Sequence, residues 1–294
     1  MCNTQILVLY IRTVKTALKL TLYKLFAIQY TLKWLSIKAF NSEKIVKFIV
    51  MKGKIRYNVI ILKLKELVLM QKKNPPQISG TLRKFALRVP TVIKECSGII
   101  VFGKRIKSLV FTTDVCIIRN VNADAVIAVY PFTPQPIITQ AVMLAADIPV
   151  FAGVGGGLTS GNRVVNLAHY AEMQGANGVV VNAPTSNEII TKLSQQIDIP
   201  VIVTVANDTV NYRERVEAGA TIFNVSAAQK TADIVKEIRQ EFPDFPIIAT
   251  GGPTDESILK TIEAGANAIT WTPPSSGEVF KDIMDAYRHD QPHP

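Results

Sequence analysis

The sequence predicts an α/β protein, a single (β/α)8 TIM barrel behind a basic, hydrophobic N-terminal extension. Three observations predict it. Eight short runs rich in β-branched residues follow residue 107, and their first residues lie 17 to 29 positions apart. An amphipathic stretch separates each run from the next, and about 225 residues from Met70 suffice for one barrel, which takes ~250.

The predicted strands are continuous apolar runs, which is typical of strands buried on both faces of a parallel sheet. They cover residues 108–113, 125–131, 149–155, 178–183, 200–206, 221–227, 246–252 and 268–272. A doubly wound open sheet is the alternative, but it normally has fewer strands and leaves its edges unpaired. The number of strands therefore favours the closed barrel.

The predicted helices cover residues 135–146, 161–175, 186–197, 210–218, 229–241, 254–264 and 276–288, after a short first helix at 114–122. Three of them end at a glycine that takes the left-handed conformation before the next strand, namely Gly175, Gly219 and Gly265. Ahead of the first strand we predict a short helix over 90–97. A hairpin of 99–102 and 106–110 around Gly103 then covers the barrel floor.

The net charge of +10 belongs to one quarter of the chain. Residues 1–73 hold 15 of the 33 Lys and Arg and two of the 23 acids, so residues 74–294 hold 18 against 21 and carry −3. This division predicts two parts, 1–73 and 74–294, and it excludes a nucleic-acid-binding reading of the whole chain.

Three interpretations of the extension stay open. It resembles translated AT-rich sequence upstream of a true start at Met51 or Met70. Alternatively, Arg12, Lys15 and Lys19 share one face of a basic helix that lies on an anionic membrane surface. It can also be an integral structural layer. Membrane contact is expected only if the extension is genuine.

The remaining composition points to a cytoplasmic protein without a metal centre. Cys2, Cys96 and Cys116 have no CxxC spacing, and no signal-peptide pattern opens the chain. His169 falls inside a predicted helix, while His289 and His293 lie in the tail, so no metal cluster is expected at the barrel mouth.

In such barrels the site lies at the carboxyl ends of the strands. Polar residues near those ends are the predicted substrate contacts: Asn182, Thr204, Asn224, Ser226, Thr250, Thr270 and Thr272. Residues two apart in a strand face the same way, so Asn224 can point into the mouth with Ser226. Structural hydrogen bonding is the competing role of these side chains.

The candidate catalytic residues are Asp114 and Tyr130. Asp114 is the one acid at a strand end and the candidate general acid or base, and capping of the following helix is its alternative role. Tyr130 is a candidate proton donor that can instead simply pack. No lysine ends strands two to eight, which disfavours a Schiff-base aldolase, and no two carboxylates converge.

A glycine-rich turn after the third strand is the first candidate anion site. Gly155 and Gly156 lie in the run 153–157, which leads into the helix that carries Arg163. Backbone N–H groups, a helix N-terminus and a guanidinium together suit a phosphate. Glycine-rich turns also occur for steric reasons alone.

The closing quarter, from Ile247-Ile248-Ala249-Thr250-Gly251-Gly252 through Glu263-Ala264-Gly265-Ala266-Asn267, resembles ribulose-phosphate-binding and related aldolase-type barrels. The resemblance implies that Gly251 and Gly252 bind a phosphate together with the turn after strand eight. Here that turn departs from the family, because Pro273 and Pro274 have no N–H. Ser275 and Ser276 can still donate, although Ser275 also begins a capping box with Glu278.

The chain from Ser79 also resembles small bacterial barrel proteins with a generic hydrolase label, through 119–125 and 130–135. We therefore expect an enzyme of isomerase, lyase or hydrolase type that acts on a small phosphorylated metabolite, forms a homo-oligomer and needs no cofactor. A non-catalytic metabolite-binding or assembly barrel is the rival, and a flavin-binding barrel is a third possibility.

Overall fold

The computed structural model describes residues 76, 78, 80 and 87–292. The chain divides into two units, Met1–Ile78 and Ser79–Pro294, and the fold below is that of the second. The predicted N-terminal extension, residues 1–73, lies outside the described residues. No helix in the described ranges is long and apolar enough to cross a membrane.

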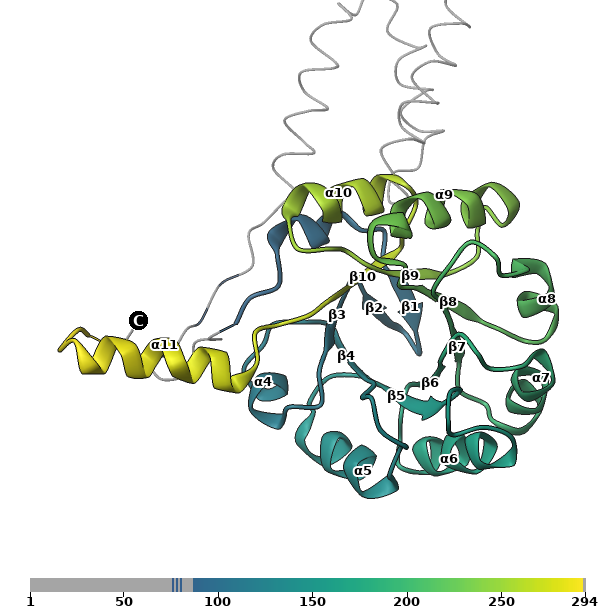
Figure 1. The fold of residues 1–294 in the computed structure, drawn as a ribbon, viewed down its shortest axis with the longest axis horizontal. Coiled ribbons are helices and arrows are strands. Elements are labelled where there is room, and N and C mark those ends of the chain that lie inside the picture. The colour runs from purple at the N-terminus through teal and green to yellow at the C-terminus, as the bar shows by residue number, and fades with distance from the viewer. Residues whose placement is uncertain (1–75, 77, 79, 81–86, 293–294) are drawn as a thin grey trace, which may run out of the picture. The chain divides into compact units, whose positions relative to one another are not determined.

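Eight parallel strands close into a barrel in the order β10-β3-β4-β5-β6-β7-β8-β9, which confirms the predicted fold (Figure 1). The strands are β3 (Ser108–Phe111), β4 (Ala125–Ala128), β5 (Val150–Gly155), β6 (Gly178–Val181), β7 (Val201–Val205), β8 (Ile222–Val225), β9 (Ile247–Thr250) and β10 (Ala268–Trp271). Each pairs with its neighbours in sequence, and β10 closes the ring on β3. All eight lie within the predicted runs.

Helices surround the barrel in the predicted alternation. They are α4 (Val115–Arg119), α5 (Pro136–Ala145), α6 (Asn162–Met173), α7 (Asn187–Gln196), α8 (Tyr212–Glu217), α9 (Thr231–Glu241), α10 (Asp255–Glu263) and α11 (Ser276–Arg288), with a 3-10 turn η2 (Ala228–Lys230) before α9. The first is five residues long, as its short sequence segment predicts. The predicted C-terminal glycines have positive φ values of 91°, 108° and 116°.

The floor of the barrel differs in detail from the prediction. The segment 90–97 forms a 3-10 helix, η1 (Thr91–Glu95), and the hairpin pairs β1 (Ile99–Val101) with β2 (Lys104–Ile106). The predicted second hairpin strand, 106–110, was wrong because residues 108–111 belong to the barrel strand β3. Val101 and Ile106 join the apolar cluster inside the barrel, so the hairpin closes its amino-terminal end.

Half-buried polar side chains hold the strand starts at this end. Asn267 Oδ1 accepts from Ile247 N at 2.9 Å and from Arg239 Nη2 at 2.9 Å. The remaining Arg239 bonds go to the carbonyl oxygens of Phe242, Pro243, Phe245 and Gly265. One guanidinium therefore joins the end of α9, the start of β9 and the loop before β10.

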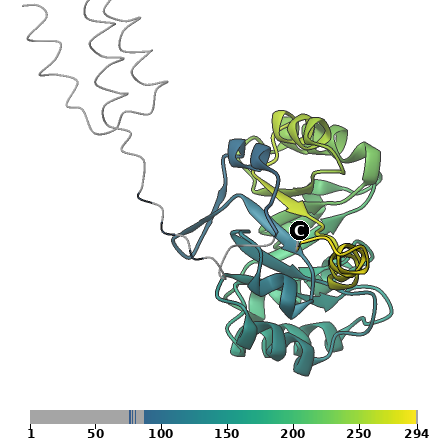
Figure 2. The same ribbon diagram turned by 90° about the vertical axis from the view of Figure 1, so that its left-hand side faces the viewer.

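The last helix stands apart from the others. Whereas α10 and α9 lie along the barrel, α11 leaves it sideways, and Figure 2 views α11 almost along its axis. No residue of α11 is buried within the described part of the chain.

Candidate functional site

The barrel interior has an apolar lower layer and a polar upper layer. Ile202, Ile222 and Ile248 belong to the apolar cluster inside the barrel. Two residues further along, the same strands present Thr204, Asn224 and Thr250 on the same side of the sheet. In register, Thr204 pairs with Asn224 and Thr250 pairs with Thr270. The polar residues predicted as substrate contacts are thus brought together at the mouth.

Two atoms of this layer lack partners. Asn224 Nδ2 donates to Thr204 Oγ1 at 3.3 Å, but Asn224 Oδ1 is buried without a partner, and so is Thr270 Oγ1. Asn224 and Thr270 are only 9% and 6% exposed. Because a buried polar group without a partner costs ~1–3 kcal/mol, an added molecule that offers a hydrogen-bond donor would complete this layer.

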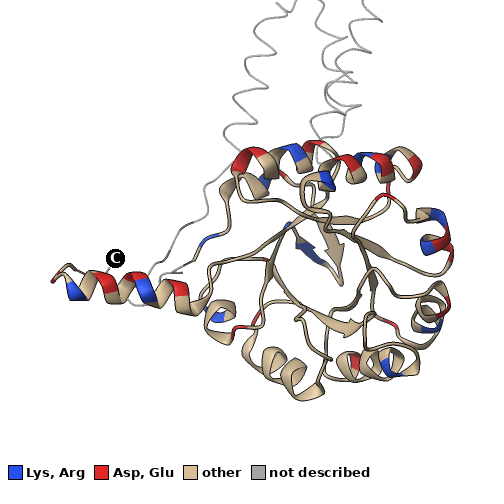
Figure 3. Ribbon diagram, in the orientation of Figure 1, with Lys and Arg blue, Asp and Glu red and all other residues tan. Residues whose placement is uncertain are grey.

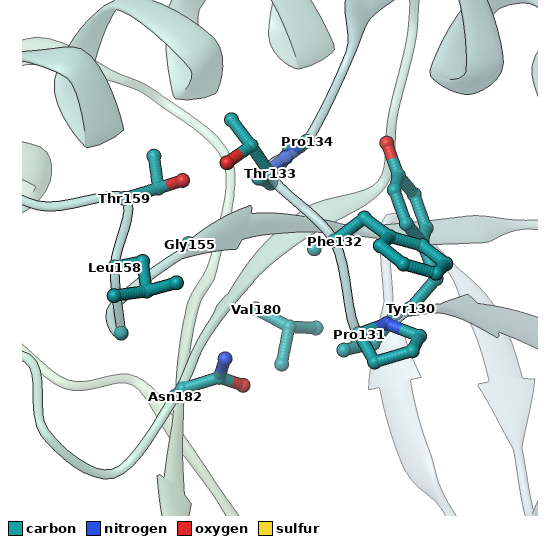
Figure 4. A pocket seen from close by; sticks show the side chains of 13 residues that line it. Tyr130, Pro131, Phe132, Thr133, Pro134, Gly155, Leu158, Thr159, Val180 and Asn182 are labelled. Carbon is teal, nitrogen blue, oxygen red and sulfur yellow. The ribbon is translucent and has the colours of Figure 1, made fainter.

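A cavity of about 420 Å³ opens at the mouth beside this layer. Its lining comprises Val129, Tyr130, Pro131, Phe132, Thr133, Pro134, Gly153, Gly155, Gly157, Leu158, Thr159, Val180 and Asn182. Figure 4 shows Phe132 and Leu158 on opposite sides of the space, with Asn182 below. The lining contains one ionisable side chain, Tyr130, and is otherwise neutral. Its volume is in the range of small-molecule sites.

The loops after β4 and β5 supply most of this lining. Sequence reasoning selected Tyr130 and the glycine turn from these loops, but not the apolar Phe132 and Leu158. Phe132 is 75% exposed and Leu158 is fully exposed. The proline-rich run 130–134 and the glycine-rich run 153–157 are visible in the sequence, but which loop leans over the mouth is set by tertiary packing. An exposed apolar residue in a loop belongs to no periodic sequence pattern that would predict its position.

The hydroxyl of Tyr130 fixes the loop that it begins. It accepts the Gln135 N–H at 2.7 Å, and Gln135 is the residue that precedes α5. The hydroxyl retains its own proton while it accepts this bond. Tyr130 therefore lines the cavity and holds the start of α5, and its role as a proton donor stays a prediction.

Asp114 caps α4, which is the alternative to catalysis that the sequence predicted for it. Its Oδ1 accepts from Cys116 N at 2.8 Å and from Ile117 N at 3.3 Å, while Ser276 Oγ donates to its Oδ2. The Ser276 hydroxyl and the two backbone N–H groups lower the pKa of this carboxyl below its usual value. Asp114 does not line the cavity, so it stands as the tie between α4 and α11.

The glycine turn after β5 is held in a specific shape. Gly156 has a φ of 106°, and its N–H donates to Thr159 O at 2.8 Å. A Cβ atom on Gly156 would lie 2.1 Å from Thr185 Oγ1, so only glycine fits there. Gly157, by contrast, faces open space and lines both the large cavity and a smaller one of about 130 Å³.

Helix α6 starts beside Gly157 without a side-chain cap. Its N-cap residue is Gly161, and no acidic residue lies in its first turn, where Arg163 is exposed. Uncapped N–H groups and an arginine give this helix end a positive potential. Gly157 thus lies where the cavity at the mouth meets the start of α6, whereas Arg163 is on the first turn of this helix and lines neither cavity.

The turn after β9 has one of its two glycine N–H groups engaged. The Gly251 N–H donates to Thr270 O at 3.4 Å, and a Cβ at Gly251 would strike Ile258 and Ile269. A capping box between Thr254 and Ser257 closes the start of α10. The glycines of this turn therefore have a steric reason to be there.

The turn after β10 is similarly occupied. The Ser275 N–H donates to Glu278 Oε2 at 2.7 Å, and Ser275 Oγ accepts the Glu278 N–H at 3.2 Å. The Ser276 hydroxyl is bonded to Asp114. Thr272 is exposed beyond the end of β10, while Ser226 is exposed and accepts the Thr250 hydroxyl at 3.2 Å.

No protein-family model matches the chain, and no curated protein matches it in sequence. Solved structures do resemble it. One is a candidate phosphonomutase from Burkholderia cenocepacia J2315, at 13% identity and a TM-score of 0.50, covering 62% of this chain and 92% of its own. Another is a phosphonopyruvate hydrolase in complex with oxalate and Mg²⁺, at 13% identity and a TM-score of 0.50, covering 65% and 85%. At this identity the likeness establishes the barrel fold.

The sequence predicted no cofactor, whereas that phosphonopyruvate hydrolase is a complex with Mg²⁺. Mg²⁺ prefers carboxylate oxygens in an octahedral arrangement. Within residues 87–292, no three His, Cys, Asp or Glu side chains are grouped so as to hold a metal ion. The carboxylate at the strand ends, Asp114, is committed to a helix cap. These residues do not fit a similar Mg²⁺ site, and the proposed function involves no metal.

Proposed function

We propose that the chain is a TIM-barrel enzyme acting on a small phosphorylated metabolite, with the phosphate bound at the turn after β5 and the start of α6. The observation that carries the proposal is the position of Gly157. This residue joins the cavity at the mouth to the uncapped end of α6, where Arg163 is exposed.

The phosphate position implied by the family resemblance, between the turns after β9 and β10, is less suitable. Glu278 already accepts the Ser275 N–H, and Asp255 and Glu256 occupy the first turn of α10. Carboxylates next to a phosphate repel it, and Glu278 also uses the Ser275 N–H that would bind it. We therefore favour the other predicted anion site, with Gly157 in place of Gly156 as the donor because the Gly156 N–H is used within the turn.

The rest of the substrate then lies in the neutral part of the mouth. Asn182 at the cavity and Thr204 beside it offer hydrogen bonds to hydroxyl or carbonyl groups, while Phe132 and Leu158 shield the space from its two sides. Tyr130 is the proton donor in this proposal, because it is the ionisable side chain at the cavity. Asp114 retains only an indirect part through the position of α11.

A non-catalytic metabolite-binding barrel is the second candidate, and the neutral lining of the cavity favours it. The enzyme and the binding barrel predict different effects of Tyr130→Phe on turnover. If the chain is an enzyme, this variant binds the metabolite with similar affinity and loses most of its turnover, since general acid catalysis contributes about 10²–10⁴-fold. If wild type and variant bind alike and neither converts the compound, the binding barrel is correct.

The experiment begins with native mass spectrometry of the full chain to identify any retained compound. Inorganic phosphate, phosphoenolpyruvate and ribulose 5-phosphate are then tested by calorimetry and for conversion. Binding of phosphorylated compounds, but not of their dephosphorylated forms, supports the proposal. A yellow protein with a flavin spectrum would instead support the flavin-binding alternative.

A further inference from the structure

A polar groove of about 610 Å³ lies between the loops that follow β6 and β7. Because both loops follow the carboxyl ends of neighbouring strands, the groove opens at the same end of the barrel as the mouth. Its lining includes three asparagine amides, three hydroxyl groups, the carboxylate of Glu214 and the guanidinium of Arg215, but no aromatic ring. The groove is therefore a polar space, unlike the neutral and largely apolar cavity at the mouth.

Glu214 is held in this groove by two neutral side chains. Asn211 Nδ2 donates to its Oε1 at 2.9 Å, and Asn187 Nδ2 donates to its Oε2 at 3.2 Å. None of the ion pairs among the described residues involves Glu214, although α8 carries charges of both signs (Figure 3). Each carboxylate oxygen can accept a second hydrogen bond. The exposed Glu214 thus presents two fixed acceptors to a ligand in the groove.

The half-buried Arg215 holds the wall of the groove. Its Nη1 donates to Asn187 Oδ1 at 2.9 Å and to Thr185 O, and its Nη2 donates to Ala183 O at 3.1 Å. This guanidinium joins the loop after β6 to α8 and fixes the amide that in turn orients Glu214. Since one acid and one base line the groove, its lining carries no net charge.

A neutral lining with amide donors and a fixed carboxylate suits a ligand rich in hydroxyl groups. Two neighbouring hydroxyl groups can donate to the two oxygens of Glu214. They can also accept from the exposed Asn207, whose Oδ1 is used by the Thr209 N–H at 3.1 Å and whose Nδ2 is the donating end. A nucleobase is disfavoured because bases stack on aromatic side chains, and a second phosphate is disfavoured because Glu214 would repel it.

The loop after β6 borders this groove and both cavities at the proposed phosphate position. Asn182 lines the cavity at the mouth, whereas Pro184, Thr185 and Ser186 line both the groove and the smaller cavity that Gly157 also lines. The smaller cavity thus shares lining residues with the mouth and with the groove, which share none with each other. A phosphate beside Gly157 therefore lies between the mouth and the groove.

We propose that the groove binds a polyol esterified to the substrate phosphate on the side away from the mouth, with Glu214 as the acceptor of its hydroxyl groups. The substrate is then a phosphodiester that joins this polyol to the group held at the mouth. The assignment rests on the proposed phosphate position at Gly157, and it names the substrate class, which the mouth alone does not.

The test compares ethyl glyceryl phosphate with ethyl propyl phosphate, two phosphodiesters of equal charge that differ only in two hydroxyl groups. Calorimetry of the full chain should show about tenfold tighter binding of the glyceryl compound, because hydrogen bonds to a charged acceptor are the strong ones. In Glu214→Gln the preference should fall to about threefold or less. Asn207→Ala, which leaves α8 unchanged, should also reduce it.

Glu188→Gln is the matched control for the loss of charge. Glu188 lies in the first turn of α7 and does not line the groove, so this variant should keep the full preference for the glyceryl compound. Equal affinity for the two compounds in wild type would overturn the inference. A preference that survives both groove substitutions, or binding of neither compound, would overturn it as well.

Gly157→Ala separates this result from the proposed function. If the variant weakens binding of both compounds and wild type has no preference between them, the phosphate position is correct and the polyol groove is wrong. If wild type prefers the glyceryl compound and Gly157→Ala changes neither affinity, the groove binds the polyol and the phosphate position is wrong.

Discussion

Asn224 donates its side-chain amide to Thr204 across 3.3 Å, and the carbonyl oxygen of the same amide is buried without a partner. The same incomplete hydrogen bonding is a property of the barrel mouth as a whole. Neighbouring strands supply neutral polar groups that satisfy one another only in part. A ligand or an ordered water molecule with a hydrogen-bond donor completes them.

Thr270→Val tests whether this incomplete layer serves binding. The substitution removes a buried hydroxyl that lacks a partner and keeps the shape of the side chain. We expect the free energy of unfolding to rise by roughly 1 kcal/mol in the absence of ligand. We also expect phosphorylated ligands to bind several-fold more weakly. Denaturant unfolding and calorimetry measure the two effects.

Thr250→Val is the matched control for that variant. The Thr250 hydroxyl has a partner in Ser226, so its removal should lower stability slightly instead of raising it. If both threonine variants lose stability to the same extent, the hydroxyl of Thr270 has a partner in the free protein, and the layer is structural.

The pH dependence of stability tests the cap at Asp114. Hydrogen bonds from Ser276 and the start of α4 hold its folded pKa below the ordinary value of 3.8. Asp114 therefore contributes stability that is present above pH 3.8 and is lost as the pH falls from there through the folded pKa. We expect Asp114→Asn to be less stable than wild type at pH 7, with a smaller further loss on acidification.

That result also separates the cap from catalysis. Urea unfolding between pH 3 and 7 measures the stability, and turnover of an identified substrate measures the chemistry. If Asp114→Asn keeps its stability at every pH but loses turnover, Asp114 is a catalytic acid or base, and its assignment as a cap is incomplete.

Arg239 is expected to be one of the most sensitive charged positions in the fold. Its guanidinium bonds to four backbone carbonyl groups and to Asn267 Oδ1. Arg239→Met should lower the free energy of unfolding by ~3 kcal/mol or more, because several part-buried acceptors lose their donor. Lys192→Met, which removes an exposed ion pair with Glu188 at 2.8 Å, should cost under ~1 kcal/mol.

Thiol labelling provides an independent check on the packing. Burial raises the pKa of Cys96 to about 11, and the side chain is 1% exposed, whereas Cys116 is exposed on α4. In a Cys2→Ser background at pH 8, a maleimide reagent should modify Cys116 within minutes and leave Cys96 unmodified until the protein unfolds. Equal rates at the two positions would contradict the placement of Cys96.

Most of the fold follows from local pattern, whereas much of the site does not. Continuous apolar runs separated by turns were enough to place the strands, because a strand buried on both faces leaves that signature. Thr204, Asn224 and Thr250 each lie two positions after an inward isoleucine, and they were correctly placed at the mouth because side chains alternate along a strand. The sequence pattern offered the helix cap at Asp114 and the capping box at Ser275 as alternatives, but it could not decide between these roles and a role in the site.

The second hairpin strand, which the sequence misplaced, lies directly before a barrel strand. The hairpin strand and the barrel strand run on from one another between Ile106 and Ser108 with only Lys107 between them, and no glycine or proline marks the break. Phe132 and Leu158 in the loops over the cavity were missed because long-range packing determines where these exposed apolar side chains lie.

The central claim is that the phosphate lies at the turn after β5, and two glycine substitutions test it directly. A methyl group at Gly157 meets no protein atom within 4 Å, and one at Gly277 at the start of α11 meets only Ser275 Oγ at 3.9 Å. Both variants should fold normally, and each places a methyl group where an anion would approach the backbone.

The deciding measurement is the affinity of the full chain for inorganic phosphate and phosphoenolpyruvate, by calorimetry, in wild type, Gly157→Ala and Gly277→Ala. We expect at least a tenfold loss for Gly157→Ala and an unchanged affinity for Gly277→Ala. The reverse result would place the phosphate at the turn after β10, and unchanged binding in both variants would contradict a backbone phosphate site at either turn.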